Sequence, residues 1–175
     1  VNEDIEVIKR VLELSKILFN INPSIKRDLR TKNMYKIVIA SKTLVEILKI
    51  FNLKSGAKGK RLEIPEQIML SNEETVRAYI RAYFDCDSWV LCKKAINRHI
   101  GFDSINCKGL FQIKQALSSF DITSTVKKRS NRNIFTLMIY GKNNLIKFQK
   151  NINYLHPKKK NKLKAVLEGD KINPE

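Results

Sequence analysis

The sequence predicts an α+β protein with antiparallel sheets, built as a pseudo-two-fold duplication whose first unit is incomplete. Three observations support this fold class: a composition typical of globular proteins, with 43% apolar and 29% charged residues, an αββαββα order of elements in the second half, and an internal repeat. We expect an incomplete first half over residues 1–70, a second half over 71–168 and a tail over 169–175.

The second half is predicted to begin with a helix from Glu73 to about Asp85. Ser71 is the expected N-cap, since Glu74 follows three residues later and completes a capping-box pattern. This helix carries the acidic residues considered below.

Alternating strands and amphipathic helices are predicted after the first helix. These elements are strands at Ser88–Ile96 and Arg98–Asp103, a helix at Cys107–Phe120, strands at Thr123–Lys128 and Asn133–Tyr140, and helices at Asn143–Asn151 and Lys159–Leu167. Within the helix that begins at Cys107, Leu110, Ile113 and Leu117 lie on one face and are expected in the core. The order αββαββα predicts an antiparallel sheet.

An internal repeat occurs at an offset of 100 residues. Tyr35–Lys42 resembles Phe135–Lys142, and both segments are predicted as a strand that runs into a helix. Upstream, the helix at Val11–Leu18 corresponds to the one at Phe111–Ser118. The repeat implies a duplication in which the first half retains only an αββα portion. The counterpart of the acidic helix would fall before Val1.

Charge is the strongest indication of a partner. The chain has 34 Lys and Arg against 17 Asp and Glu, a formal net charge of +17, which favours an anionic partner, above all nucleic acid. A membrane partner is not expected, since no segment approaches the roughly 18 apolar residues of a span. Three cysteines without CxxC spacing favour a reducing compartment, so the expected location is intracellular, cytoplasmic and DNA-associated.

Two carboxylates, Asp85 and Asp87, lie inside the most basic part of the chain. Residues 75–167 contain 19 Lys or Arg and only four acids. Carboxylates at a helix C-terminus face the negative end of the helix dipole, so a compensating cation is expected. A solvated polar turn is the plainer interpretation, but the basic surroundings favour a divalent cation held between protein and phosphodiester.

The segment Ile80–Ser88 resembles the LAGLIDADG motif of homing endonucleases in its intein-type form. That resemblance implies αββαββ units that pair through their motif helices, with Ala82 and Phe84 at the helix interface and each sheet in the DNA major groove. It also implies that Asp87 binds a catalytic Mg²⁺ or Mn²⁺, with Asp85 nearby. The motif departs from the family at Ser88, which replaces a terminal Gly.

The same resemblance places Lys159 in a basic segment before the last helix, where a lysine polarises the attacked phosphate or orients water. A basic first helical turn is electrostatically unfavourable, which indicates an anion nearby. General DNA affinity is an equally good interpretation of this segment.

Other basic residues are predicted to contact DNA through phosphates or base edges, although a solvated loop is the alternative for those near residue 130. These predicted contacts are Lys93, Lys94, Arg98, Lys127, Lys128, Arg129, Arg132, Lys158 and Lys160.

Two alternative uses of side chains are set aside. The set Cys86, Cys92, His99 and Cys107 lacks any closely spaced pair of zinc ligands. Trp89 and Phe102 are expected in the core rather than as base-stacking platforms.

We therefore predict a homing-endonuclease-type protein that binds double-stranded DNA and belongs to a family of metal-dependent phosphodiesterases. Cleavage is expected to need a second acidic helix, from an upstream segment or a second copy of the chain. The alternatives are a catalytically inactive DNA-binding module and an RNA-splicing maturase of the same fold.

Overall fold

The chain forms two compact units, Val1–Leu53 and Lys54–Glu175, which are described separately. The computed structural model describes residues 4–28, 34–51, 63–92, 97–130 and 132–169. The limits predicted from the sequence for the two halves and the tail stay predictions.

Unit 1 is a short helix–hairpin–helix element. Its elements are α1 (Ile5–Phe19), β1 (Ser24–Asp28), β2 (Met34–Val38) and α2 (Lys42–Ile50). Asp4 caps α1 by accepting a hydrogen bond from the backbone N–H of Glu6, and Ser41 caps α2 by accepting one from Leu44. The strands pair antiparallel, so the predicted αββα order of the first half is confirmed.

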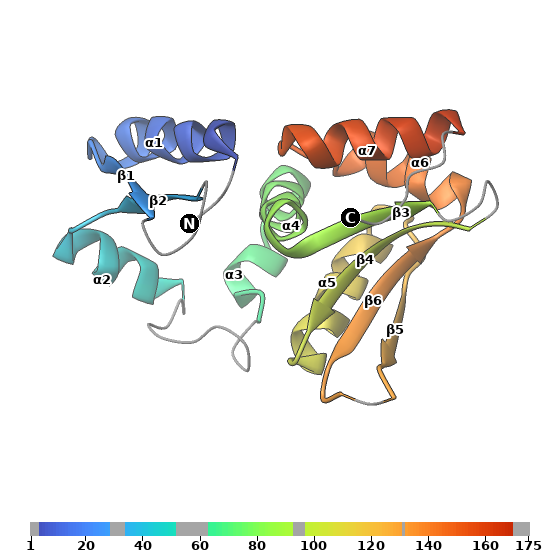
Figure 1. The fold of residues 1–175 in the computed structure, drawn as a ribbon. Helices are drawn as coiled ribbons and strands as arrows, with labels where there is room; N and C mark the ends of the chain where they lie inside the picture. Colours follow the sequence, from blue (N-terminus) through green and yellow to red (C-terminus); the bar gives the residue numbers. More distant parts are fainter. Residues whose placement is uncertain (1–3, 29–33, 52–62, 93–96, 131, 170–175) are drawn as a thin grey trace. The chain divides into compact units, whose positions relative to one another are not determined.

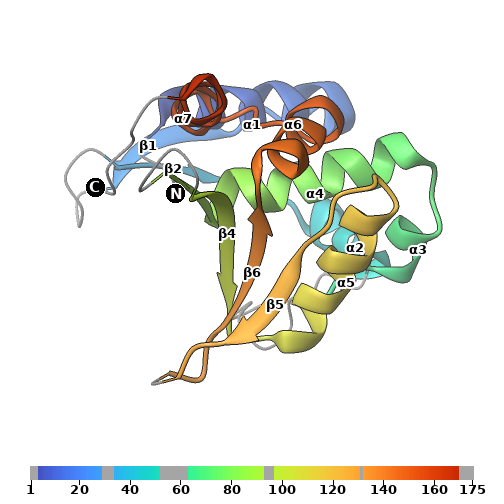
Figure 2. The same cartoon turned by 90° about the vertical axis from the view of Figure 1, so that its right-hand side faces the viewer.

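Unit 2 is an α+β domain with one antiparallel sheet (Figure 1). Its elements are α3 (Glu66–Met69), α4 (Glu73–Asp87), β3 (Ser88–Cys92), β4 (Arg98–Ser104), α5 (Cys107–Ser118), β5 (Thr125–Lys128), β6 (Phe135–Tyr140), α6 (Lys142–Asn151) and α7 (Pro157–Glu168). The strand order is β3-β4-β6-β5, and Figure 2 shows β4, β6 and β5 side by side. The predicted αββαββα order and antiparallel sheet are confirmed.

The two units repeat the same order of elements. Tyr35 of β2 and Lys42, which begins α2, correspond to Phe135, which begins β6, and Lys142, which begins α6. In unit 2, β6 lies between β5 and β4, whereas β2 pairs with β1 alone among the described residues. The described part of unit 1 therefore has no counterpart of α4, β3 and β4.

The helix α4 begins and ends differently from the prediction. Its N-cap is Asn72, whose Oδ1 accepts a hydrogen bond from the N–H of Thr75 at 2.9 Å. Ser71 is not the cap, because its hydroxyl donates to the carbonyl of Ile68. The helix continues to Asp87 and ends where Ser88 becomes extended. Ser71 and Asn72 are both suitable N-cap residues, and the prediction of Ser71 from the capping-box pattern was wrong.

The core of unit 2 lies between the sheet and its helices. Phe84 of α4 is fully buried, with its ring 5.7 Å from that of Phe102 in β4 and 4.9 Å from that of Phe148 in α6. Leu110 and Ile113 of α5 are buried in the same cluster, as predicted. Phe102 is confirmed as a core residue. These apolar contacts fix α4 against the sheet.

Side-chain alternation divides the sheet into a covered and an open face. Ile100 and Ile139 are cross-strand partners buried against the helices, so their sequence neighbours project from the other side. On that open face the ring of Trp89 lies on Gly101, where an added Cβ would come within 2.1 Å of the indole. Trp89 is half-buried rather than a core residue, which corrects the prediction.

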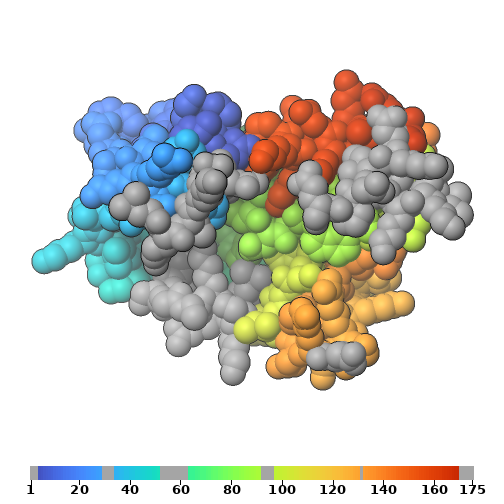
Figure 3. Space-filling view, viewed as in Figure 1, coloured from blue at the N-terminus to red at the C-terminus, as the bar shows by residue number. Residues whose placement is uncertain are grey.

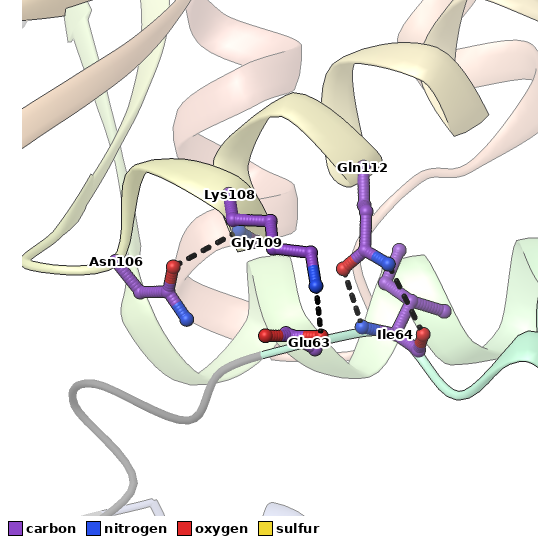
Figure 4. A network of polar contacts seen from close by, with 6 residues as sticks. All are labelled: Glu63, Ile64, Asn106, Lys108, Gly109 and Gln112. Carbon is purple, nitrogen blue, oxygen red and sulfur yellow. Dashed lines mark hydrogen bonds and ion pairs between the residues drawn. The ribbon is translucent and has the colours of Figure 1, made fainter.

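The segment before α3 is fastened to α5 by polar contacts (Figure 4). Ile64 donates its N–H to Oε1 of Gln112 at 2.9 Å and accepts from Nε2 of the same side chain at 3.4 Å. Lys108 pairs with Glu63 at 2.9 Å. One amide thus replaces the two backbone partners that a neighbouring strand would supply.

Gln112→Ala is expected to lower the free energy of unfolding by about 1–2 kcal/mol, because the half-buried backbone groups of Ile64 lose both partners. Gln115→Ala, at an exposed position of the same helix, is the matched control and is expected to have little effect. Urea unfolding followed by circular dichroism measures both. Equal effects of the two substitutions would contradict the fastening role.

Candidate nucleic-acid interface

The carboxylate of Asp85 binds the N-terminal end of α7. It accepts hydrogen bonds from the backbone N–H groups of Leu155 and His156, both at 3.0 Å, and its second oxygen lies 3.2 Å from the same Leu155 nitrogen. Asp85 is buried, and α7 begins at Pro157 without a hydrogen bond from its own N-cap side chain. The acid therefore acts as a cap supplied by another helix.

Lys159 makes the reciprocal contact. Its ammonium group donates to the carbonyl oxygens of Phe84 at 3.0 Å and Asp85 at 2.7 Å, which belong to the last turn of α4. A cation at a helix C-terminus and an anion at a helix N-terminus are both favourable. Asp85 and Lys159 thus each bind backbone groups at the end of the other helix, so both charges are compensated within the protein.

Ser88 completes this junction at the point where α4 passes into β3. Its hydroxyl donates to the carbonyl of Phe84 at 2.6 Å, so the hydroxyl of Tyr154, 2.9 Å away, donates to Ser88 Oγ. Both residues are buried. The residue that replaces the Gly of the motif therefore has a structural use that Gly lacks.

Burial shifts the pKa of both charged residues at the junction. Desolvation raises the pKa of Asp85, and the hydrogen bonds from His156 and Leu155 and the charge of Lys159 oppose the shift. Desolvation likewise lowers the pKa of Lys159, opposed by the charge of Asp85. Each charged group is therefore partly withdrawn from bulk water, which strengthens its hydrogen bonds to the backbone of the other helix.

Asp87 differs from Asp85 because its side chain is exposed at the end of α4. Within the described ranges, no three His, Cys, Asp or Glu side chains are grouped so that they could hold a metal ion. Mg²⁺ commonly keeps several water ligands and takes only one or two carboxylates together with substrate phosphates. Asp87 therefore fits such an ion as one ligand of an incomplete set.

The open face of the sheet carries a polar cluster next to an aromatic row. Three side chains, from Asp103 of β4, Thr136 of β6 and Arg129 just after β5, are hydrogen-bonded to one another. The aromatic row consists of Trp89, His99 and Tyr140, with ring centroids 5.2 and 5.5 Å apart. These groups lie on adjacent strands because His99 pairs with Leu91 and Tyr140. Of these residues, only Arg129 was predicted from the sequence to contact DNA.

The basic residues near the β5–β6 hairpin divide between the two faces. Lys127 is exposed on β5, and its cross-strand partner is Thr136 of the open face. Lys128 is exposed at the end of β5 and alternates to the same side as Val126, which packs on the core. Arg132 is exposed in the turn. Side chains of this hairpin and of α7 lie at the molecular surface in Figure 3.

The remaining predicted positions are more scattered. Arg98 points to the covered side, where its guanidinium lies near Gly169 at the end of α7. Lys158 and Lys160 are exposed in the first turn of α7, and Ala82 is exposed on α4. Lys93 and Lys94 lie outside the described residues. No helix in the described ranges is both long and apolar enough to cross a bilayer.

The central part of unit 2 is similar to a known protein family. Residues 74–153 match the family described as LAGLIDADG-like domain. This range runs from the start of α4 to just beyond α6, so it contains the acidic helix, the complete sheet and the polar cluster of the open face.

Solved structures share the fold. The crystal structure of I-DmoI in complex with DNA and Mn superposes with a TM-score of 0.61 at 17% identity, covering 86% of this chain and 77% of that chain. A structure of mesophilic variants from the homing endonuclease I-DmoI gives a TM-score of 0.61 at 17% identity, covering 86% and 76%. The predicted α+β LAGLIDADG-type fold is therefore confirmed.

Curated relatives match this chain over small parts of long proteins. The replication factor C small subunit of Methanocaldococcus jannaschii is 29% identical over 98% of this chain and 9% of its own length. The probable translation initiation factor IF-2 of M. jannaschii is 28% identical over 95% and 14%. The replication factor C small subunit of Thermococcus kodakarensis is 27% identical over 90% and 17%. The chain thus spans less than a fifth of the length of these relatives.

Asp85→Ala is expected to lower the free energy of unfolding by about 2–3 kcal/mol, because two backbone N–H groups at the start of α7 lose a charged acceptor. Asp85→Asn is expected to cost less, since the amide oxygen still accepts from both groups. Urea unfolding measures whether Asp85→Ala lowers the free energy of unfolding more than Asp85→Asn does. Glu74→Ala, exposed at the other end of α4, is the control, and an Asp85→Ala effect no larger than the control's would contradict the capping role.

Proposed function

We propose, from the match of residues 74–153 to the LAGLIDADG-like domain family, that this chain binds double-stranded DNA and supplies one half of a divalent-metal-dependent DNA endonuclease site. The observation that carries the proposal is the contrast between the two acids at the end of α4. Asp85 is buried and committed to the backbone of α7, whereas Asp87 is exposed beside it.

DNA binding is proposed for the open face of the sheet and its basic edges. Lys127, Lys128 and Arg132 are exposed around the β5–β6 hairpin, and a net charge of +17 adds a long-range attraction for phosphates. The face itself presents hydrogen-bonding and aromatic groups rather than an apolar surface. Such a face suits contact with base edges in a major groove. Lys158 and Lys160 stay proposed phosphate contacts.

Asp87 is the proposed metal ligand. A bound Mg²⁺ or Mn²⁺ would supply Lewis-acid activation of water and neutralise charge on the phosphodiester. The contribution of the protein is to fix the carboxylate, because Lys159 and Ser88 hold the last turn of α4 through its carbonyl groups. We therefore assign Asp85 and Lys159 to positioning of this turn, and Asp87 alone to direct contact with the metal.

A second acidic helix is proposed to complete the site. Within the described residues, unit 1 has no counterpart of α4, β3 and β4, although its four elements repeat the order of α5, β5, β6 and α6. The missing carboxylate would come from another segment of the same gene product or from a second copy of this chain. Without it, the chain is proposed to act as a DNA-binding module, which is the second candidate function.

An intein-type setting is supported by the pattern of relatives. Nearly all of this chain, 98% and 95%, matches only 9% and 14% of a replication factor C small subunit and a probable translation initiation factor. Proteins whose names indicate unrelated activities share this segment, so the segment does not perform the activity that either name gives. We propose that it is a separate module carried within longer polypeptides.

Binding to duplex DNA is expected to depend steeply on salt. If about six phosphates are contacted, affinity should fall roughly 1,000-fold between about 50 and 200 mM salt. Fluorescence anisotropy of labelled duplexes measures this dependence. The double substitution Lys127→Ala and Lys128→Ala should make the plot of log affinity against log salt concentration less steep, by the amount expected for the loss of about two phosphate contacts. The control is Lys49→Ala, at a lysine already paired with Glu46. Affinity that ignores salt would contradict phosphate binding.

Asp87→Asn is expected to abolish Mg²⁺- or Mn²⁺-dependent cleavage and to leave DNA binding equal or tighter, because a negative charge near phosphate is removed. Nicking of supercoiled DNA is measured for this chain and for the product of the whole reading frame. Glu74→Gln removes the same charge from the other end of α4 and should leave cleavage intact.

The same assay tests the need for a second acidic helix. We expect cleavage only where that helix is supplied. Double-strand cleavage by a monomer of these 175 residues would refute the proposal that this chain supplies only one half of the active site. Cleavage that persists in Asp87→Asn would refute the assigned ligand. Binding without cleavage in every form of the protein would identify the chain as a DNA-binding module.

A further inference from the structure

We infer that Arg129, held by Asp103 and Thr136, is a base-reading residue that recognises guanine in the major groove. This inference rests on the proposed binding of duplex DNA and goes beyond it, because it assigns sequence specificity to a defined side chain.

The three side chains form a closed set of hydrogen bonds. Arg129 donates from Nε to Oγ1 of Thr136 at 3.1 Å and from Nη2 to Oδ2 of Asp103 at 2.8 Å. Thr136 in turn donates from Oγ1 to Oδ1 of Asp103 at 2.5 Å. Every pair in the set is joined, so the guanidinium plane is fixed in two directions.

The sheet supports this arrangement. Asp103 and Thr136 are cross-strand partners on β4 and β6, and Arg129 follows the end of β5, where its backbone N–H donates to Ile134. Thr136 is buried, whereas the side chains of Asp103 and Arg129 are 32% and 44% exposed. The base of the cluster is thus rigid while the tip of the guanidinium remains accessible. Ordering this side chain in advance lowers the entropy cost of binding.

The bonds that hold Arg129 leave one edge of its guanidinium available. Of its five N–H donors, the Nε–H and the adjacent Nη2–H point to Thr136 and Asp103. The opposite edge carries an Nη1–H and the second Nη2–H, which are parallel. Guanine presents O6 and N7 as paired acceptors in the major groove, and a bidentate arginine contact with them is the commonest specific one.

The charge of the cluster favours a base edge over a phosphate. Asp103 lies 2.8 Å from the guanidinium, so the pair is close to neutral, and a phosphate bound to Arg129 would be repelled by the neighbouring carboxylate. Lys127 and Lys128 are exposed nearby and form no salt bridge within the described residues. Those lysines suit phosphate, whereas Arg129 suits an uncharged pair of acceptors.

Selection of bound duplexes from a random library, followed by sequencing, tests this assignment. The natural chain is expected to enrich sequences with a guanine at one defined position. Arg129→Lys keeps the charge but loses the bidentate edge, so the preference for guanine at that position should fall about tenfold or more, with the other positions unchanged. Asp103→Asn should weaken the same preference, because the guanidinium is held less firmly. Circular dichroism verifies that both variants fold.

Lys128→Ala is the control, and it should lower affinity for all sequences without changing the preferred one. An unchanged preference in Arg129→Lys, or a loss spread equally over all sequences, would overturn the inference. Duplex binding with no sequence preference at all would overturn it as well, while leaving the proposed function intact. Failure to bind any duplex would overturn the proposed function and this inference together.

Discussion

The reciprocal capping of α4 and α7 is the interaction on which the rest of unit 2 depends. Asp85 satisfies N–H groups that would otherwise be unpaired at the start of α7, and Lys159 satisfies carbonyls at the end of α4. Hydrogen bonds to charged groups are each worth about 1.5–3 kcal/mol, and truncating one partner leaves the other buried and unpaired. The two helix ends are thus interlocked, and α4 must end where it does. The exposed position of Asp87 follows from that ending.

Because its side chains alternate, the sheet has one face that packs against the helices and one open face that we propose for DNA recognition. Residues such as Ile100 and Ile139 bury apolar surface against the helices, while their neighbours are free of that constraint. On the open face, Trp89 covers Gly101, and the Arg129 cluster is supported from two further strands. Changes on the open face are therefore expected to disturb the core less than changes on the covered face. The covered face offers no such freedom, because its residues are close-packed.

The sequence predicted the features that depend on neighbouring residues. Helical spacing identified Leu110 and Ile113 as core residues. Hydrophobic patterning predicted the order of elements in unit 2, and the repeat extended that order to unit 1. The partner of Asp85 could not be predicted in the same way, because it lies 70 residues away and is a backbone N–H group that any residue carries. Arg129 and Asp103 are 26 residues apart and meet only because β4, β5 and β6 lie in one sheet. Contacts of this kind require the register, and a pattern of residue types does not supply it.

The proposed sharing of a metal ion between two related halves agrees with the small number of acids near the proposed site. In a pair of related halves, each half needs to contribute only one carboxylate to a shared metal ion, and additional exposed acids would repel the phosphates that the basic residues attract. The other acids of this region have partners within the protein. Asp85 is hydrogen-bonded to the backbone before α7, Asp103 is paired with Arg129, and Asp121 is paired with Lys147. Asp87 is the remaining acid between Thr75 and Leu167. Asp87 is exposed and has no hydrogen bond or ion pair among the described residues, and for this reason we propose it as the metal ligand.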